Sequence, residues 1–253
     1  MLKAILFDLS GVLYDGDQVI DGAVDAIERV QDTSLDIRFI TNTSQKTRQR
    51  ILDGLKEMGF SISDSQVYTA TEIAKQWLEE NDRRPYCLVH KQIREEFDEL
   101  DQSDPNAVLI GDAGEDFTFA NLNRAFQLCQ QGAVLAGIGY NRYYSQDDQL
   151  MLDAGPFIKA IEFAADTEAT ILGKPSETFF EQVLATTGAK PEEALMIGDD
   201  VFGDVEGAIK AGLQGCLVRT GKYQQSDEDK ISGDFFVAGS IVDAVEHALK
   251  QSD

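Results

Sequence analysis

The chain of 253 residues is poor in cysteine, proline and tryptophan, with three, five and one of each. Cys87, Cys129 and Cys216 are scattered and have no CxxC spacing, so they build neither a disulfide framework nor a zinc site. No apolar run approaches the roughly 18 residues that a membrane-spanning helix needs. The first residues, MLKAILFDLSG, lack a cleavable apolar leader. We therefore expect a cytoplasmic protein that does not enter membranes.

Positive charge is also scarce, because 22 basic residues stand against 45 acidic ones and give a formal net charge of −23. Such a field repels polyanions, so nucleic acid is not expected as a partner. If the substrate is itself an anion, its attraction has to be local. A bound cation and a few placed lysines or backbone amides would supply it, and this requirement favours a metal-dependent protein.

Short apolar runs alternate with segments of helical period, which predicts an α/β protein with a mostly parallel sheet. The alternation occupies residues 1–66 and resumes at about residue 167 with the run ATILGK. Residues 67–166 repeat it and are long enough for a domain of their own, with a helix expected in IREEFDEL. The sequence thus predicts a core formed by residues 1–66 and 167–253, into which residues 67–166 are inserted as a second α/β domain.

Polar residues follow the apolar runs KAILF, DIRFI, ATILG and LMIG at the points where the predicted strands end. The carboxyl ends of parallel strands form the ligand crevice of an open sheet, so such residues can converge although they are distant in sequence. Each also has a structural explanation, since aspartate and threonine often cap the following helix. The residues at these ends are Asp8, Ser10, Thr41, Asn42, Lys174, Asp199 and Asp200.

This set is what phosphoryl transfer requires. A carboxylate such as Asp8 can attack phosphorus and form an aspartyl-phosphate, which splits one difficult displacement into two easier ones. Mg²⁺ prefers a few carboxylate oxygens, which Asp8 and Asp199 would supply, together with water and phosphate oxygens. Thr41 and nearby backbone amides can donate to phosphate oxygens, and Lys174 adds a point charge there.

The segments FDLSGVLYD, FITNTSQKT, ILGKPS and MIGDDVFGD resemble, in this order and spacing, the four motifs of the haloacid dehalogenase superfamily. The large insertion resembles the cap of its type IIA members. The resemblance implies a Rossmann-like parallel-sheet core with an inserted α/β cap domain, a Mg²⁺ cofactor and a small phosphorylated substrate, and proteins with such caps often form homodimers. It implies these roles: Asp8 as nucleophile and metal ligand, Ser10 as a metal ligand through its carbonyl, Thr41 and Asn42 as phosphate-binding residues, Lys174 as the residue that holds phosphate and nucleophile together, Asp199 as a metal ligand, and Asp204 as a support of the metal's water shell.

One position departs from the family pattern. Most phosphatases of this superfamily carry an acid/base aspartate two residues after the nucleophile, where this chain has Ser10. A well-placed acid is worth about 10²- to 10⁴-fold in rate. Either the leaving group needs no proton, as in a phosphoramidate or metal-bound pyrophosphate, or water, a cap residue or the substrate supplies it. Two alternatives stay open: a broad phosphomonoesterase, and a catalytically weak phosphate-binding or regulatory protein.

Arg142 lies in the predicted cap, in the stretch NRYY that follows an apolar run. A guanidinium there can bind a second anionic group of the substrate through paired hydrogen bonds. The same stretch can equally be a structural loop. Arg142 is therefore a candidate substrate-binding residue.

Overall fold

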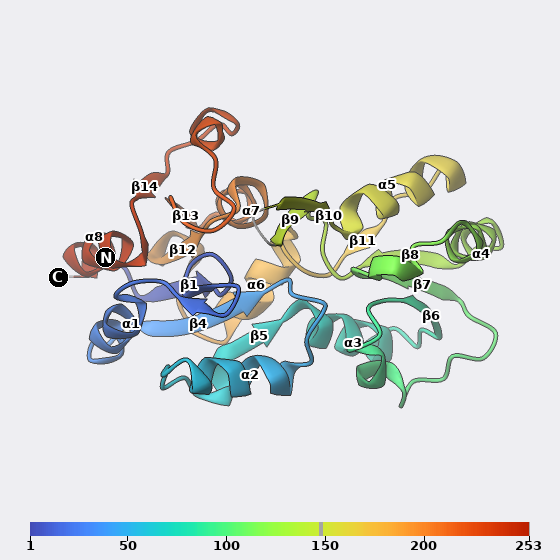
Figure 1. Ribbon diagram of the computed structural model, residues 1–253, viewed down its shortest axis with the longest axis horizontal. Helices are drawn as coiled ribbons and strands as arrows, with labels where there is room; N and C mark the ends of the chain where they lie inside the picture. Colours follow the sequence, from blue (N-terminus) through green and yellow to red (C-terminus); the bar gives the residue numbers. More distant parts are fainter. Residues whose placement is uncertain (147–148, 253) are drawn as a thin grey trace. The chain divides into compact units, whose positions relative to one another are not determined.

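The structure is a computed structural model, and it describes residues 1–146 and 149–252 (Figure 1). The described chain divides into two compact units. The first contains residues Met1–Thr41, Ile51–Tyr68 and Lys174–Asp253, and the second contains Asn42–Arg50 and Thr69–Gly173. Each unit has a parallel sheet of its own, so the α/β class predicted from the sequence is confirmed.

The first unit is built on a six-stranded sheet with the order β14-β13-β12-β1-β4-β5 (Figure 1). Strand β1 pairs in parallel with β4 and β12, and β13 pairs in parallel with β12 and β14. Strand β1 is buried along its whole length, as expected of a central strand covered on both faces. The strands are β1 (Ala4–Asp8), β4 (Asp36–Thr41), β5 (Val67–Thr69), β12 (Ala194–Gly198), β13 (Gln214–Val218) and β14 (Phe236–Ala238).

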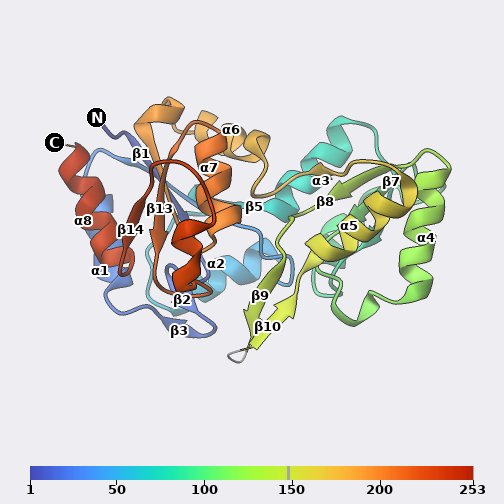
Figure 2. The same cartoon turned by 90° about the horizontal axis from the view of Figure 1, so that it is seen from above.

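Helices cover both faces of this sheet (Figure 2). Side chains from α1, α2 and α8 pack in one apolar cluster with Phe7 and Phe39, whose rings stack 5.7 Å apart. On the other face, Val201 and Val205 pack against Leu217. The helices are α1 (Ala23–Gln31), α2 (Arg48–Glu57), α6 (Glu177–Ala185), a π-helical segment (Val201–Glu206), α7 (Gly207–Lys210) and α8 (Ile241–Ser252), with 3-10 turns at Asp64–Gln66, Pro191–Glu193 and Gln225–Asp229 and a small hairpin of β2 (Tyr14–Asp15) and β3 (Gln18–Val19).

The second unit contains a four-stranded parallel sheet with the order β11-β8-β7-β6. Its core joins sheet residues such as Val108 and Ile110 to Leu128 of α4 and Ile158 of α5. The elements are β6 (Pro85–Leu88), β7 (Ala107–Ile110), β8 (Val134–Gly137), β11 (Thr170–Ile171), α3 (Ala70–Glu80), α4 (Phe119–Gln130), α5 (Ala154–Ala165), 3-10 turns at Arg94–Phe97 and Gly114–Asp116, and a hairpin of β9 (Tyr143–Gln146) and β10 (Gln149–Leu152).

The structure corrects the sequence interpretation at several places. The run ATILG was expected to restart the core sheet, but β11 pairs with β8 in the sheet of the second unit. Strand β5 belongs to the first sheet although it begins at residue 67, where the insertion was expected to start. The segment IREEFDEL forms only a short 3-10 helix, and the β9–β10 hairpin was not predicted. Short strands acquire their sheet from tertiary pairing, which local sequence does not specify.

None of the helices that residues 1–146 and 149–252 form is both long and apolar enough to cross a membrane.

Candidate active site

The strand ends of the first unit bring several of the predicted residues together. Asp8 is the last residue of β1 and Thr41 the last of β4, and both are buried. The Cα of Asp8 pairs with that of Ile40, so Thr41 follows directly beside the aspartate. Asp199 comes one residue after the end of β12, the other neighbour of β1. Three adjacent parallel strands thus present their polar residues at one edge, as the sequence predicted.

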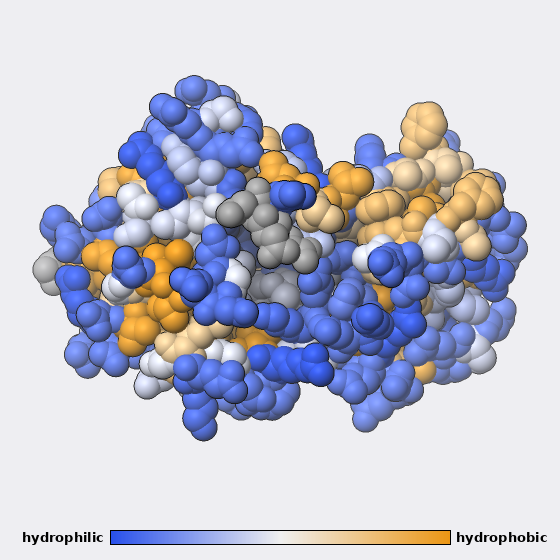
Figure 3. All heavy atoms as spheres, in the orientation of Figure 1, coloured by the Kyte–Doolittle hydropathy of each residue, from blue (hydrophilic) through white to orange (hydrophobic). Residues whose placement is uncertain are grey.

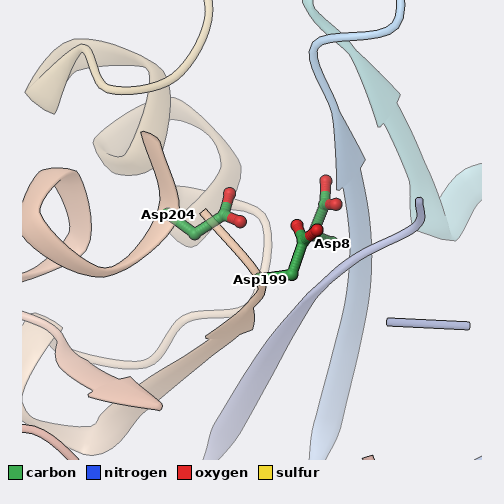
Figure 4. A group of neighbouring side chains, drawn as sticks. All are labelled: Asp8, Asp199 and Asp204. Carbon is green, nitrogen blue, oxygen red and sulfur yellow. The ribbon is translucent and has the colours of Figure 1, made fainter. Parts of the chain in front are cut away.

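Three buried carboxylates form the centre of this edge (Figure 4). Asp8, Asp199 and Asp204 each offer one oxygen, and these oxygens all lie within 4.8 Å of one another. Asp204 comes from the π-helical segment after β12 and is only 1% exposed. Three anionic groups in so small a volume repel one another strongly unless cations balance them.

Lys174 is the cation nearest to the nucleophile candidate. Its Nζ contacts Asp8 Oδ1 at 2.5 Å and Asp204 Oδ1 at 2.6 Å, and its side chain is 5% exposed. Burial by itself lowers the pKa of Lys174, but the charges of Asp204 and Asp8 outweigh it and raise the pKa above its ordinary value. The lysine therefore stays protonated and fixes the orientation of the Asp8 carboxylate.

The pKa values of the remaining acids report the crowding of negative charge. Burial raises the pKa of Asp199 well above its ordinary value, and the charges of Asp8 and Asp204 raise it further against the opposing charge of Lys222. Burial also raises the pKa of Asp204, to about 6, although Lys174 counteracts it. Without a further cation, these two acids hold protons more tightly than free aspartate does.

The residues present fit a divalent metal ion. The cluster and its immediate partners contain four carboxylates and two lysines, so with all of them ionised their net charge is −2. The residues are Asp8, Asp199, Asp200, Asp204, Lys174 and Lys222. The ligand atoms at the centre are all carboxylate oxygens, which Mg²⁺ prefers over nitrogen or sulfur ligands. Asp8, Asp199 and Asp204 are the side chains that could hold such an ion or its water shell.

A glycine keeps the backbone close to this cluster. Gly11 has φ +84°, and a Cβ built on it would lie 2.1 Å from Asp199 Oδ2. Any larger residue would therefore displace the Asp199 carboxylate, and the left-handed backbone adds strain for other residues. The glycine after the first predicted strand has a direct steric reason here.

Three other predicted site residues make contacts of their own. Ser10 is exposed and forms an isolated bridge with Tyr14. Asn42 belongs to the second unit, where its Nδ2 donates to Asn141 Oδ1 at 3.1 Å. Arg142 is also in the second unit, is exposed, and its carbonyl accepts from the backbone N–H of Asp153. The roles of Ser10, Asn42 and Arg142 remain predictions.

Sequence reasoning missed one part of the site, the loop of residues 219–222 after β13. Lys222 donates its backbone N–H to Asp199 Oδ2 at 2.8 Å, and its Nζ contacts Asp200 Oδ2 at 2.7 Å. Thr220 Oγ1 donates to the carbonyl oxygen of Gly11 at 2.5 Å. A signal was present, because the stretch RTGK follows the apolar run GCLV at a strand end, as the other polar residues do.

Comparison with known proteins agrees with this geometry. A sequence model of the family described as haloacid dehalogenase-like hydrolase matches residues 5–103. A second family model, described as HAD-hydrolase-like, matches residues 171–244. The phospholysine phosphohistidine inorganic pyrophosphate phosphatase of Xenopus laevis is 46% identical over 100% of this chain and 96% of that protein. Haloacid dehalogenase-like hydrolase domain-containing protein 2 of Bos taurus is 45% identical over 98% of this chain and 96% of its own.

Among solved structures, the 4-nitrophenylphosphatase of Thermotoga maritima has a TM-score of 0.86 at 22% identity and covers 97% of each chain. At this identity the likeness shows the fold. The chain belongs to the haloacid dehalogenase-like hydrolase family. It is an enzyme, a phosphatase of that family.

Proposed function

We propose that this phosphatase is Mg²⁺-dependent and hydrolyses a small phosphorylated compound through a phospho-aspartate on Asp8. The observation that carries the proposal is the buried cluster in which Lys174 bridges Asp8 and Asp204 beside Asp199. The cluster combines the Asp8 carboxylate, which Lys174 orients, with an excess negative charge that a single divalent cation would cancel. Bound Mg²⁺ would supply Lewis-acid stabilisation of the phosphoryl oxygens and reduce the repulsion between two anions.

The first half-reaction uses the carboxylate that Lys174 holds. An oxygen of Asp8 attacks phosphorus, the bond from phosphorus to the leaving group breaks, and the leaving group departs with the bonding electron pair. Lys174 and the hydroxyl of Thr41 would donate to the phosphoryl oxygens, where charge develops. In the second half-reaction water attacks the phospho-aspartate, which releases inorganic phosphate and restores the Asp8 carboxylate.

Phosphate release from p-nitrophenyl phosphate, pyrophosphate, phospholysine and phosphohistidine, with Mg²⁺ or with EDTA, tests this function. We expect metal-dependent turnover that Asp8→Asn abolishes. The curated relative from Xenopus laevis bears the name of a phosphatase for phospholysine, phosphohistidine and pyrophosphate, which supports including those substrates. Equal turnover across simple monoesters would favour the broad phosphomonoesterase. Phosphate binding without metal-dependent turnover would favour a regulatory binding protein.

We also propose that Ser10 restricts the leaving groups. Its exposed hydroxyl is a poor proton donor near neutral pH, so a leaving group that needs no proton should be favoured. The rate on a series of aryl phosphates should therefore rise steeply with leaving-group acidity. Ser10→Asp should accelerate the poorest leaving groups, by up to about 10²- to 10⁴-fold, and flatten the dependence. A flat dependence in the unchanged protein would refute this restriction.

We further propose a homodimer formed through the second unit. Its large exposed apolar side chains include Phe119 at 84%, Phe163 at 90% and Leu152 at 63%. Figure 3 shows apolar surface gathered over α5, and exposed apolar patches of this kind mark interaction sites. Light scattering should give twice the chain mass, and Phe163→Glu should lower it to that of one chain. A monomer at all concentrations would exclude the homodimer.

A cytoplasmic location is proposed as well, since Cys87, Cys129 and Cys216 are free thiols, and proteins of reducing compartments rarely carry disulfides. Cell fractionation tests it, and recovery outside the cytoplasmic fraction would refute it.

A further inference from the structure

The loop of residues 219–222 contacts three parts of the candidate site at once. Thr220 binds the Gly11 carbonyl, and the backbone and ammonium of Lys222 bind Asp199 and Asp200 respectively. Gly221 has φ +63°, and a Cβ on it would lie 2.2 Å from Asp199 Oδ2. The Asp199 carboxylate is therefore enclosed by the backbone of this loop, which places Lys222 beside the cluster rather than in bulk solvent.

The neighbouring residues Asp199 and Asp200 have different contacts, and the ammonium of Lys222 binds Asp200. Asp200 Oδ1 accepts from the backbone N–H groups of Phe202 and Gly203 at 2.9 Å each, and Oδ2 contacts the ammonium of Lys222. Both oxygens of Asp200 are thus engaged by the helix start and the lysine. Asp199 instead lies in the cluster with Asp8 and Asp204.

The charge of Lys222 acts at short range and with little screening. The side chains of Lys222 and Asp200 are each 17% exposed. The backbone N–H of Lys222 donates to Asp199 Oδ2 at 2.8 Å, so the residue lies directly beside the cluster. A lysine in this place repels a bound cation and attracts a bound phosphate.

We propose that Lys222 is a positioning residue that holds Asp200 away from the metal and keeps the net charge of the cluster at the value that one divalent cation cancels. The inference rests on the proposed Mg²⁺-dependent function. Loss of the Lys222 charge should strengthen the binding of Mg²⁺ and weaken the binding of inorganic phosphate. A residue that only maintained the fold would weaken both interactions when it was replaced.

The test replaces Lys222 by methionine, which removes the charge and keeps the backbone N–H that binds Asp199. Calorimetry at pH 8 measures Mg²⁺ affinity, and competitive inhibition measures the affinity for inorganic phosphate. A unit charge lost at this short, poorly screened range changes ion affinity on the order of tenfold. We expect Lys222→Met to bind Mg²⁺ about tenfold more tightly and inorganic phosphate about tenfold more weakly. Lys222→Arg should keep both affinities close to those of the unchanged protein.

Two further variants keep the test decisive. Lys210→Met removes an exposed lysine of the same unit, whose ammonium contacts Glu206 at 3.2 Å, and should change neither affinity. If Lys222→Met folds poorly because Asp200 loses its partner, the double variant Lys222→Met with Asp200→Asn removes both charges and keeps an acceptor oxygen for the helix start. The double variant should return both affinities toward their original values.

The outcomes separate the two proposals. If the unchanged protein binds no Mg²⁺, the proposed function itself fails. If the unchanged protein binds Mg²⁺ but Lys222→Met shifts neither affinity, or weakens both, Lys222 does not balance the charge and the inference is overturned.

Discussion

Replacement of Lys174 by methionine should destabilise the first unit strongly when no metal is bound. The ammonium contacts Asp8 at 2.5 Å and Asp204 at 2.6 Å, and only 5% of the side chain is exposed, so solvent cannot replace it. Removal of one partner from such a buried pair costs about 3–5 kcal/mol, because the remaining charges stay buried and unpaired. We expect a loss of this size in the free energy of unfolding at pH 7 in EDTA.

Two conditions should reduce the loss for the same physical reason. Saturating Mg²⁺ supplies positive charge to the carboxylates, and at pH 5 Asp204 accepts a proton, since its pKa is already about 6 with the lysine present. In both cases less unpaired charge remains in the folded protein. Catalytic turnover should stay low in every condition, because Asp8 has lost the group that orients it.

Urea unfolding followed by far-UV circular dichroism measures this loss. Trp77 in α3 is the only tryptophan of the sequence and belongs to the second unit, so its fluorescence follows that unit separately. Lys210→Met is the matched control, and an exposed pair of this kind contributes about 0–1 kcal/mol. The reasoning is refuted if Lys174→Met costs less than about 1 kcal/mol in EDTA, or if Mg²⁺ and low pH leave the loss unchanged.

Two further predictions concern the same cluster. The folded-state pKa of Asp204 is about 6, against an ordinary value of 3.8, so this group stabilises the metal-free protein below pH 4 and the contribution is lost as pH rises through 6. A pKa shift of about 2 corresponds to about 3 kcal/mol in the free energy of unfolding. Stability in EDTA should therefore fall from pH 4 to 7, and Mg²⁺ should reverse the fall. A stability in EDTA that rises over this range would contradict the prediction. Gly221→Ala should weaken Mg²⁺ binding because the new Cβ would lie 2.2 Å from Asp199 Oδ2, whereas Gly16→Ala, with a similar φ of +58° and open space, should cost stability without changing Mg²⁺ affinity. Calorimetric titration of both variants checks this, and equal Mg²⁺ affinities would show that the contact with Asp199 is unimportant.

The alternation of apolar runs and helical periods was sufficient to predict a parallel α/β protein, because strand β1 is buried throughout and its neighbours β4 and β12 carry similar apolar runs. The same logic placed Asp8, Thr41 and Asp199 at adjacent strand ends, where the structure has them. These features depend on local pattern and on the geometry of parallel sheets, both of which the sequence contains.

Tertiary structure decided the features that depend on pairing across the chain. The two-residue strand β11 joined the sheet of the second unit, yet Lys174, three residues later, still reaches Asp8 and Asp204. The place of Lys222 beside Asp199 likewise depends on where the loop after β13 meets Gly11. A lysine carries the same charge on a surface or in a buried cluster. Only the packing around it determines whether water screens that charge or whether it balances the negative charge of buried carboxylates. The sequence by itself does not contain that packing.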